Sequence, residues 1–370
     1  MKSNYNQLGQ YIEMVSRTNS DLKYGIEDVR GCSNTKQMMQ TRANLIGRTY
    51  EKFIVLKPQE FVFNRRTTRN GEKIGMAYNN TDREYIFTND YVAFRVKQEY
   101  LDKLLPDYLY LFFCRDEFDR YARYKSTGSA TEFFNWEDMC AVPFEIPPMD
   151  FQQLIVNAYK VLNERIETKQ KINDNLAEYL NCIYIKLTKD IQSTTSLSAI
   201  CDYVTEKVIF SEVDTSVYVS TENILPDKQG VGSFGKTSPS DRVTYFREKD
   251  VLVSNIRPYF KKMWFATTSG GCNADVLCFR ALDKKYSYLL KSILFQDSFF
   301  DYVMSGAKGT KMPRGDKKHI MQYQIPCFLD TQLQKFNELA SSIEHNQALN
   351  RQEISALESA KEILLTTLSR

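Results

Sequence analysis

The stretch that decides the fold spans residues 151–189 and reads FQQLIVNAYKVLNERIETKQKINDNLAEYLNCIYIKLTK. It contains neither glycine nor proline, the residues that most often end a helix, and its apolar residues return at heptad spacing. One heptad row holds Ile155, Leu162, Leu176 and Ile183, and the partner row holds Tyr159, Ile166 and Leu180, with Lys169 and Asn173 as interruptions. This pattern predicts a long helix with an apolar seam on one side.

A second helix of the same kind is predicted after Pro326. Its two rows are Phe336, Ile343, Asn350, Leu357 and Leu364, and Leu333, Ala340, Gln347, Ile354 and Leu368. Each helix could simply cover its own globular domain, but two matching seams favour a helix pair, because each seam needs a partner. Asn173, Gln347 and Asn350 lie near the middles of the seams, where a buried polar group can fix the register at some cost in stability.

The composition is typical of a globular protein with two domains: 370 residues, of which 42% are hydrophobic and 26% charged. The longest apolar runs are far shorter than the roughly 20 residues that a bilayer crossing needs, and the first residues lack the apolar segment of a signal peptide. Eight cysteines form no C-x-x-C pair and two histidines are present, so we expect reduced thiols, no metal site and a cytoplasmic protein. A net charge of +3 neither proves nor excludes a polyanionic partner.

An internal repeat divides the sequence. Ile146-Pro147 recurs as Ile325-Pro326, 326 − 147 = 179 residues later, and each pair leads into a long helix. EFVFNR at residues 60–65 matches DVLVSN at 250–255, and in each half strand-like runs precede a helical segment, 107–124 and 285–305. We therefore predict an α+β fold: mixed α/β domains in pseudo-repeat at 1–148 and 193–326, and long helices within 149–192 and 327–370.

The sequence shows no recognisable catalytic motif. Gly230, Gly232 and Gly235 nominally fit a dinucleotide-binding fingerprint, but no strand precedes them and Pro239 follows too soon for a helix to open, so the segment is interpreted as a loop. Walker A, HExxH, GxSxG and NPP[FY] motifs are missing, and two histidines leave little capacity for acid-base chemistry at neutral pH. We expect a protein without catalytic residues of its own.

The stretch DVLVSNIRPYFKK at residues 250–262 resembles the recognition-domain motif of the specificity subunit of type I restriction-modification systems. Residues 217–226 and 272–277 are similar to the strands that flank this motif, and the first half, from 28–31 to 61–64, is similar to another form of the same domain. The first half departs from the motif where NRRTTR at 64–69 stands in place of NIRPY at 255–259. The resemblance covers essentially the whole chain.

This resemblance implies two target recognition domains, each reading one half of a split double-stranded DNA target, and an antiparallel coiled coil of the long helices that sets the unread spacer. About 40 helical residues span roughly 60 Å, which suits a spacer. It also implies that two methyltransferase subunits dock on the coil and that restriction and translocase subunits join through them. S-adenosylmethionine, ATP and Mg²⁺ would then belong to those partners and not to this chain.

Two alternatives stay open. The chain could be the specificity subunit of a compact system whose partner is one fused methyltransferase-nuclease chain. It could also be a scaffold whose helices and globular domains bind protein and not DNA.

Two polar loops in each half meet the requirements of DNA recognition, which needs bidentate donors for base edges and Lys, Arg, Ser or Thr for phosphates. In the first half the candidates are Asn64, Arg65, Arg66, Arg69, Lys125, Ser126, Thr127, Ser129 and Thr131. In the second half they are Asn255, Arg257, Tyr259, Lys261, Lys262, Lys308, Thr310, Lys311 and Arg314. The opposing interpretation buries Tyr259 and Arg257 for structural reasons and treats the charge runs as solvated faces.

Overall fold

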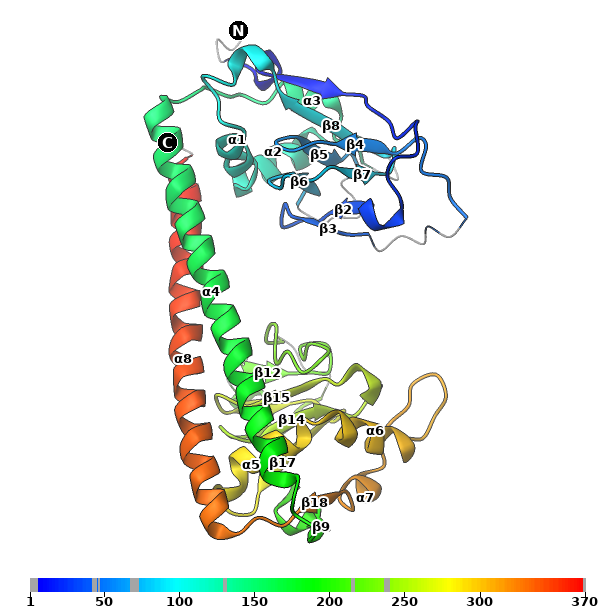
Figure 1. Cartoon of the computed structure of the whole chain (residues 1–370), viewed down its shortest axis with the longest axis vertical. Helices are drawn as coiled ribbons and strands as arrows, with labels where there is room; N and C mark the ends of the chain where they lie inside the picture. Colours follow the sequence, from blue (N-terminus) through cyan, green and yellow to red (C-terminus); the bar gives the residue numbers. More distant parts are fainter. Residues whose placement is uncertain are drawn as a thin grey trace. The chain divides into compact units, whose positions relative to one another are not determined.

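The chain forms two compact units, shown in the computed structural model of Figure 1, which describes residues 6–41, 45, 47–66, 73–128, 132–213, 217–235 and 240–368. The first unit comprises Met1–Thr168 and Glu353–Arg370, and the second comprises Lys169–Gln352. Two long helices belong to both units. Helix α4 (Met149–Thr188) passes from the first unit into the second, and helix α8 (Asp330–Thr367) passes from the second back into the first.

The first unit is built on an antiparallel sheet with the strand order β1, β8, β5, β6. Alternate residues of β5 point to opposite faces of the sheet. Phe61 and Phe63 pack against the helices, whereas Val62 packs against two smaller sheets, β2 with β3 and β4 with β7. The strands are β1 (Ile12–Val15), β2 (Arg30–Cys32), β3 (Met38–Gln40), β4 (Ile54–Leu56), β5 (Phe61–Asn64), β6 (Met76–Tyr78), β7 (Tyr85–Phe87) and β8 (Tyr91–Val96), and the shorter helices are α1 (Pro106–Phe113), α2 (Asp116–Lys125) and α3 (Trp136–Cys140).

The second unit repeats this plan with the sheet order β10, β17, β14, β15. Val251 and Val253 of β14 face the helices, and Leu252 faces a second sheet with the order β11, β13, β16, β12. The strands are β9 (Thr194–Ser196), β10 (Cys201–Tyr203), β11 (Lys207–Ile209), β12 (Tyr218–Val219), β13 (Arg242–Phe246), β14 (Val251–Ser254), β15 (Met263–Phe265), β16 (Gly270–Cys272), β17 (Val276–Ala281) and β18 (Gln324–Pro326). The shorter helices are α5 (Ser287–Leu294), α6 (Asp297–Ser305) and α7 (Lys317–Ile320).

The predicted α+β fold with an internal repeat is therefore confirmed. Strands β5 and β14 hold the same central place in the two main sheets, and each sheet is followed by two helices, α1 and α2 or α5 and α6. The predicted helical segments 107–124 and 285–305 are each broken in two. The break in the first unit falls at Arg115, which is buried and donates hydrogen bonds to the carbonyls of Phe112 and Leu368.

The long helices pack along their seams in antiparallel fashion. In the second unit, Tyr184 of α4 contacts Phe336 of α8. Asn173, which comes earlier on α4, contacts Asn350, which comes later on α8. In the first unit, the Lys361 ammonium lies 4.9 Å from the ring centre of Tyr159. In both units, a later position on α4 contacts an earlier position on α8, which confirms the predicted antiparallel coiled coil.

The three polar seam residues predicted to fix the register lie together in the second unit. Asn350 donates from Nδ2 to Asn173 Oδ1 at 2.8 Å, and Gln347 donates from Nε2 to the backbone oxygen of Asn173 at 2.8 Å. Gln347 and Asn350 are only 7% and 8% exposed. Their role in setting the register stays a prediction.

No helix among the residues that the structure describes has both the length and the apolar character that crossing a membrane would require.

Candidate nucleic-acid interface

The two predicted DNA-binding segments of the second unit lie side by side. Segment 255–262 leaves the end of β14, and loop 308–314 leaves the end of α6 as a hairpin in which Lys308 and Arg314 exchange two backbone hydrogen bonds of 2.9 Å. The backbone nitrogen of Arg257 donates to Pro313 O at 2.8 Å, and Ile256 bridges Arg314. Segments about fifty residues apart in the sequence thus form one pair of loops, named here the second loop pair.

Segment 255–262 is held in an unusual backbone conformation. Arg257 and Lys261 have φ values of 51° and 50°, in the left-handed region that residues with a Cβ rarely adopt. Between them Pro258–Phe260 forms a single 3-10 turn, and the Pro258 ring is buried. This turn leaves Tyr259 48% and Phe260 39% exposed. Arg257 is exposed as well, so the interpretation that buries Tyr259 and Arg257 is wrong.

The first unit contains an equivalent loop pair. Thr127 and Phe133 exchange backbone hydrogen bonds of 3.1 and 2.9 Å, as Lys308 and Arg314 do, and Phe134 N donates to Arg65 O at 2.8 Å. Arg66 bridges Phe133 in the way that Ile256 bridges Arg314. Segment 64–66 and loop 127–133 are named here the first loop pair. Three of the predicted residues, Arg69, Ser129 and Thr131, lie outside the described residues.

Most predicted cations of the second loop pair have a partner within the protein. The Lys308 ammonium lies 2.7 Å from Asp316, and its hydrogen bond helps to lower the pKa of that carboxyl to about 2. Arg314 pairs with Asp275 at 3.1 Å and Lys261 pairs with Asp297 at 3.1 Å. The ammonium of Lys262 donates to Thr221 O at 2.8 Å.

Like Arg257, which is also exposed, Lys311 differs from the paired cations of the second loop pair. It is exposed, and no ion pair to it is found among the described residues. Thr310 beside it is exposed too. A lysine without a nearby carboxylate carries its full charge to an approaching phosphate, whereas a paired lysine must first give up its partner.

The first loop pair and the end of α2 beside it are basic and aromatic. The Arg65 guanidinium lies 5.9 Å from the ring centre of Phe133, and Arg66 pairs loosely with Asp90 at 3.5 Å. Lys125 lies 5.8 Å from the ring centre of Tyr124, which is 83% exposed. Sequence reasoning missed Tyr124, because no local pattern distinguishes an exposed tyrosine at a helix end from a buried one.

The remaining predicted polar groups make local contacts. Asn64 Oδ1 accepts a hydrogen bond from the backbone nitrogen of Arg66 at 3.0 Å, and the Ser126 hydroxyl donates to Ala122 O at 2.7 Å. Asn255 Oδ1 is buried and has no hydrogen-bond partner among the residues that the structure describes, and a Cβ on Gly315 would come within 3.0 Å of it. Asn64 and Ser126 thus make hydrogen bonds within their own segments, and the contacts of Asn64, Ser126 and Asn255 with DNA stay a prediction.

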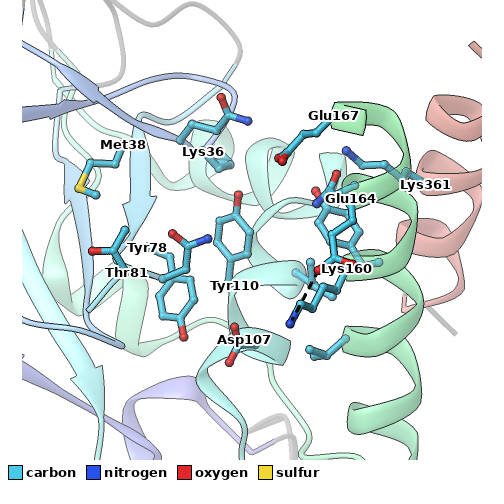
Figure 2. A pocket seen from close by; sticks show the side chains of 16 residues that line it. Lys36, Met38, Tyr78, Thr81, Asp107, Tyr110, Lys160, Glu164, Glu167 and Lys361 are labelled. Carbon is cyan, nitrogen blue, oxygen red and sulfur yellow. Dashed lines mark ion pairs between the residues drawn. The ribbon is translucent and has the colours of Figure 1, made fainter. Parts of the chain in front are cut away.

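A pocket of about 650 Å³ in the first unit lies between α1, the turn that leads into β3, and α4 (Figure 2). Figure 2 shows Tyr110 and Asp107 of α1 facing Glu164 and Lys160 of α4 across this space. Burial raises the pKa of Tyr159, at its margin, to about 12, so this hydroxyl stays protonated at neutral pH. Among the described residues, the lining includes no residue of the first loop pair.

Comparisons with known proteins found one family model and several solved structures that resemble this chain. Residues 17–178 match the model of the type I restriction modification DNA specificity domain. No curated protein matches this chain in sequence. Among solved structures, the S subunit of a type I restriction-modification system from M. genitalium is similar over 99% of this chain and 96% of its own, at 11% identity and a TM-score of 0.52.

Two further structures are similar over a comparable length. A structure of the type I restriction-modification system, described in terms of complex assembly and conformational transition, covers 98% of this chain and 96% of its own at 14% identity, with a TM-score of 0.45. The HsdS subunit from Thermoanaerobacter tengcongensis covers 98% and 95% at 15% identity, with a TM-score of 0.38. The M. genitalium structure, with its TM-score of 0.52, supports the fold. At 11% identity it supports nothing beyond the fold.

Proposed function

We propose that this chain is a DNA specificity subunit of a type I restriction-modification system and reads one half of a split DNA target with each of its units; the match of residues 17–178 to the specificity-domain model supports this. The observation that carries the proposal is the repetition of the loop pair. Arg66, Thr127 and Phe133 in the first unit take the backbone places of Ile256, Lys308 and Arg314 in the second. Similar scaffolds with different side chains are what recognition of two different half-sites requires.

Within each loop pair, the basic side chains supply attraction to the DNA backbone and the exposed planar groups face the bases. Lys311, Lys308 and Arg314 provide positive charge in the second unit, and the exposed side chains of Arg257 and Tyr259 lie on the adjoining segment. In the first unit, Arg65, Arg66 and Lys125 supply the charge, and the ion pair of Arg66 with Asp90 exchanges readily because it is loose and exposed.

The coiled coil sets the spacer and docks two methyltransferase subunits in this proposal. Large apolar side chains on α4 are exposed although they have no place in the seam: Leu154 (65%) and Val161 (60%) in the first unit, and Ile172 (40%) and Tyr179 (52%) in the second. Within each pair the residues are seven positions apart, which places them on one helix face. An exposed apolar row of this kind marks a surface for another protein.

The chemistry belongs to the partners in the same proposal. Methylation would use S-adenosylmethionine on the methyltransferase subunits, and ATP and Mg²⁺ would serve restriction subunits that join through them. This chain contributes the choice of sequence.

The test is to assemble the full chain with its methyltransferase subunits and to map methylated adenines in the DNA of cells that carry the complex. The proposal predicts one split motif with a fixed spacer. Methylation at a motif that is not split, or no methylation at all, would refute the proposal.

A substitution in loop 308–314 tests whether this loop binds the second half-site. Lys311→Ala should weaken binding to the second half-site by roughly three- to tenfold at physiological salt and lower the salt slope of binding by about one, because one phosphate contact is lost. Lys284→Ala, which removes an exposed lysine elsewhere in the same unit, is the matched control. An unchanged slope in Lys311→Ala would remove loop 308–314 from the interface.

A further inference from the structure

A third loop lies against the second loop pair. Residues 225–230 form a tight turn, in which Leu225 N donates to Gly230 O at 2.8 Å and buried Ile224 bridges Val231. Asp227 and Lys228 have φ values of 54° and 62°, so two successive non-glycine residues are held in the left-handed region. Such a conformation persists only where surrounding contacts hold it.

Those contacts come from segment 255–262. Asp227 N donates to Phe260 O at 2.9 Å, and Lys228 N donates to Lys261 O at 2.9 Å. Because Arg257 of the same segment is hydrogen-bonded to Pro313, loop 225–230, segment 255–262 and loop 308–314 form a continuous row of three loops.

One carboxylate at the start of α6 forms ion pairs with two of these loops. Asp297, the first residue of α6, lies 2.7 Å from the Lys228 ammonium through Oδ1 and 3.1 Å from the Lys261 ammonium through Oδ2. Lys228 also donates to Phe295 O at 3.1 Å. The two lysines therefore share one anion, and their charges serve to hold the loops together.

A similar ion pair lies in the first unit. Lys73, which follows the basic segment of that unit, lies 3.3 Å from Asp116, the first residue of α2. Helices α2 and α6 hold equivalent places, so an Asp–Lys pair lies at the start of the equivalent helix in each unit.

With Lys228 and Lys261 occupied, the exposed polar side chains left at the tip of loop 225–230 are those of Asp227 and Gln229, and of the two it is Gln229 that can donate a hydrogen bond to a base. It is exposed, and no hydrogen bond to its side-chain amide is found among the described residues. A glutamine amide offers one donor and one acceptor, the pair that matches N7 and N6 of adenine in the major groove. A lysine or arginine there would favour guanine or phosphate instead.

We propose that loop 225–230 is a third reading loop of the second unit, that Gln229 contacts an adenine edge in the second half-site, and that Asp297 is the positioning residue that holds this loop in place. This inference rests on the proposed function and deepens it. Sequence patterns indicate this segment only as a plain loop. In this proposal it is a determinant of specificity.

The experiment maps adenine methylation by the assembled complex carrying Gln229→Ala. One A·T pair of the second half-site should become degenerate, with discrimination there falling on the order of tenfold, while the first half-site and the spacer stay unchanged. Gln192→Ala, which changes an exposed glutamine in the connection after α4, is the matched control. A wild-type complex without any split motif would refute the proposed function itself.

A second variant tests the positioning role. Asp297→Asn should free two lysines, so binding to random duplex should rise and its salt slope should steepen by about one to two, while the second half-site becomes less selective. A second half-site that is unchanged in Gln229→Ala, or degeneracy that appears in the first half-site, would overturn the inference. So would a salt slope in Asp297→Asn equal to that of the wild type.

Discussion

At the scale of single residues, a buried ion pair organises the first unit. Lys36 and Asp119 pair with side chains only 3% and 6% exposed, and Ile74 satisfies both: its carbonyl accepts from Lys36 at 2.7 Å and its nitrogen donates to Asp119 at 3.0 Å. Burial lowers the pKa of Lys36 and raises the pKa of Asp119, because each charge is costly away from water, and the mutual attraction opposes both shifts. The pair thus ties the turn before β3 and the start of β6 to α2.

Asp119→Ala should therefore destabilise the first unit by about 3–5 kcal/mol, because it leaves the Lys36 charge buried without its partner. Each unit contains one tryptophan, Trp136 or Trp264. Urea unfolding in a Trp264→Phe background, followed by tryptophan fluorescence, reports on the first unit. Glu117→Ala removes an exposed partner of Arg120 on the same helix and should cost less than about 1 kcal/mol. Equal losses in the two variants would contradict the role given to the buried pair.

At the scale of elements, the coiled coil combines an apolar seam with one polar layer. Leu180 and Tyr184 of α4 share a core with Leu333 and Phe336 of α8, whereas Asn173 meets Gln347 and Asn350. Apolar side chains tolerate small shifts along a seam. Directed hydrogen bonds do not, so the polar layer is the part that can specify one alignment.

Asn350→Leu should leave both units folded while the complex methylates targets with more than one spacer length. It removes the hydrogen bond to Asn173, which contributes on the order of 1 kcal/mol, and adds apolar contact that makes neighbouring alignments more equal in free energy. The readout is the spacer distribution in the methylation map. Asn346→Leu, at an exposed position of the same helix, is the control. A single spacer in Asn350→Leu would argue against register control by this layer.

The elements that depend on local periodicity could be predicted from the sequence, and the contacts between distant segments could not. Heptad spacing predicts both long helices, and the repeat predicts equivalent loops. The break at Arg115 depends on the carbonyl of Leu368, which is 253 residues away. The ties of Lys261 to Asp297 and of Lys262 to Thr221 likewise depend on which loops the fold brings together. No local pattern distinguishes such lysines from Lys311.

At the scale of the whole molecule, the exposed row on α4 predicts how many partners the chain carries. In the proposed complex with two methyltransferase subunits, Val161→Asp in the first unit and Tyr179→Asp in the second should each reduce the number bound from two to one. A charge buried without a partner in an apolar contact weakens binding by roughly a hundredfold. Native mass spectrometry measures the copy number, with Glu178→Ala as the control at an exposed neighbouring position. Two copies retained in both variants would place docking elsewhere.

The first unit is built from two separate segments of the chain, and this affects its folding during synthesis. Its core includes Leu364 and Leu365 from the end of α8, and its Arg115 bonds to Leu368, whereas the second unit is one uninterrupted run of chain. A ribosome therefore delivers all of the second unit before it delivers the last residues that the first unit needs. We therefore expect the unit that is translated first to finish folding last and to expose apolar surface until the end of α8 packs against it.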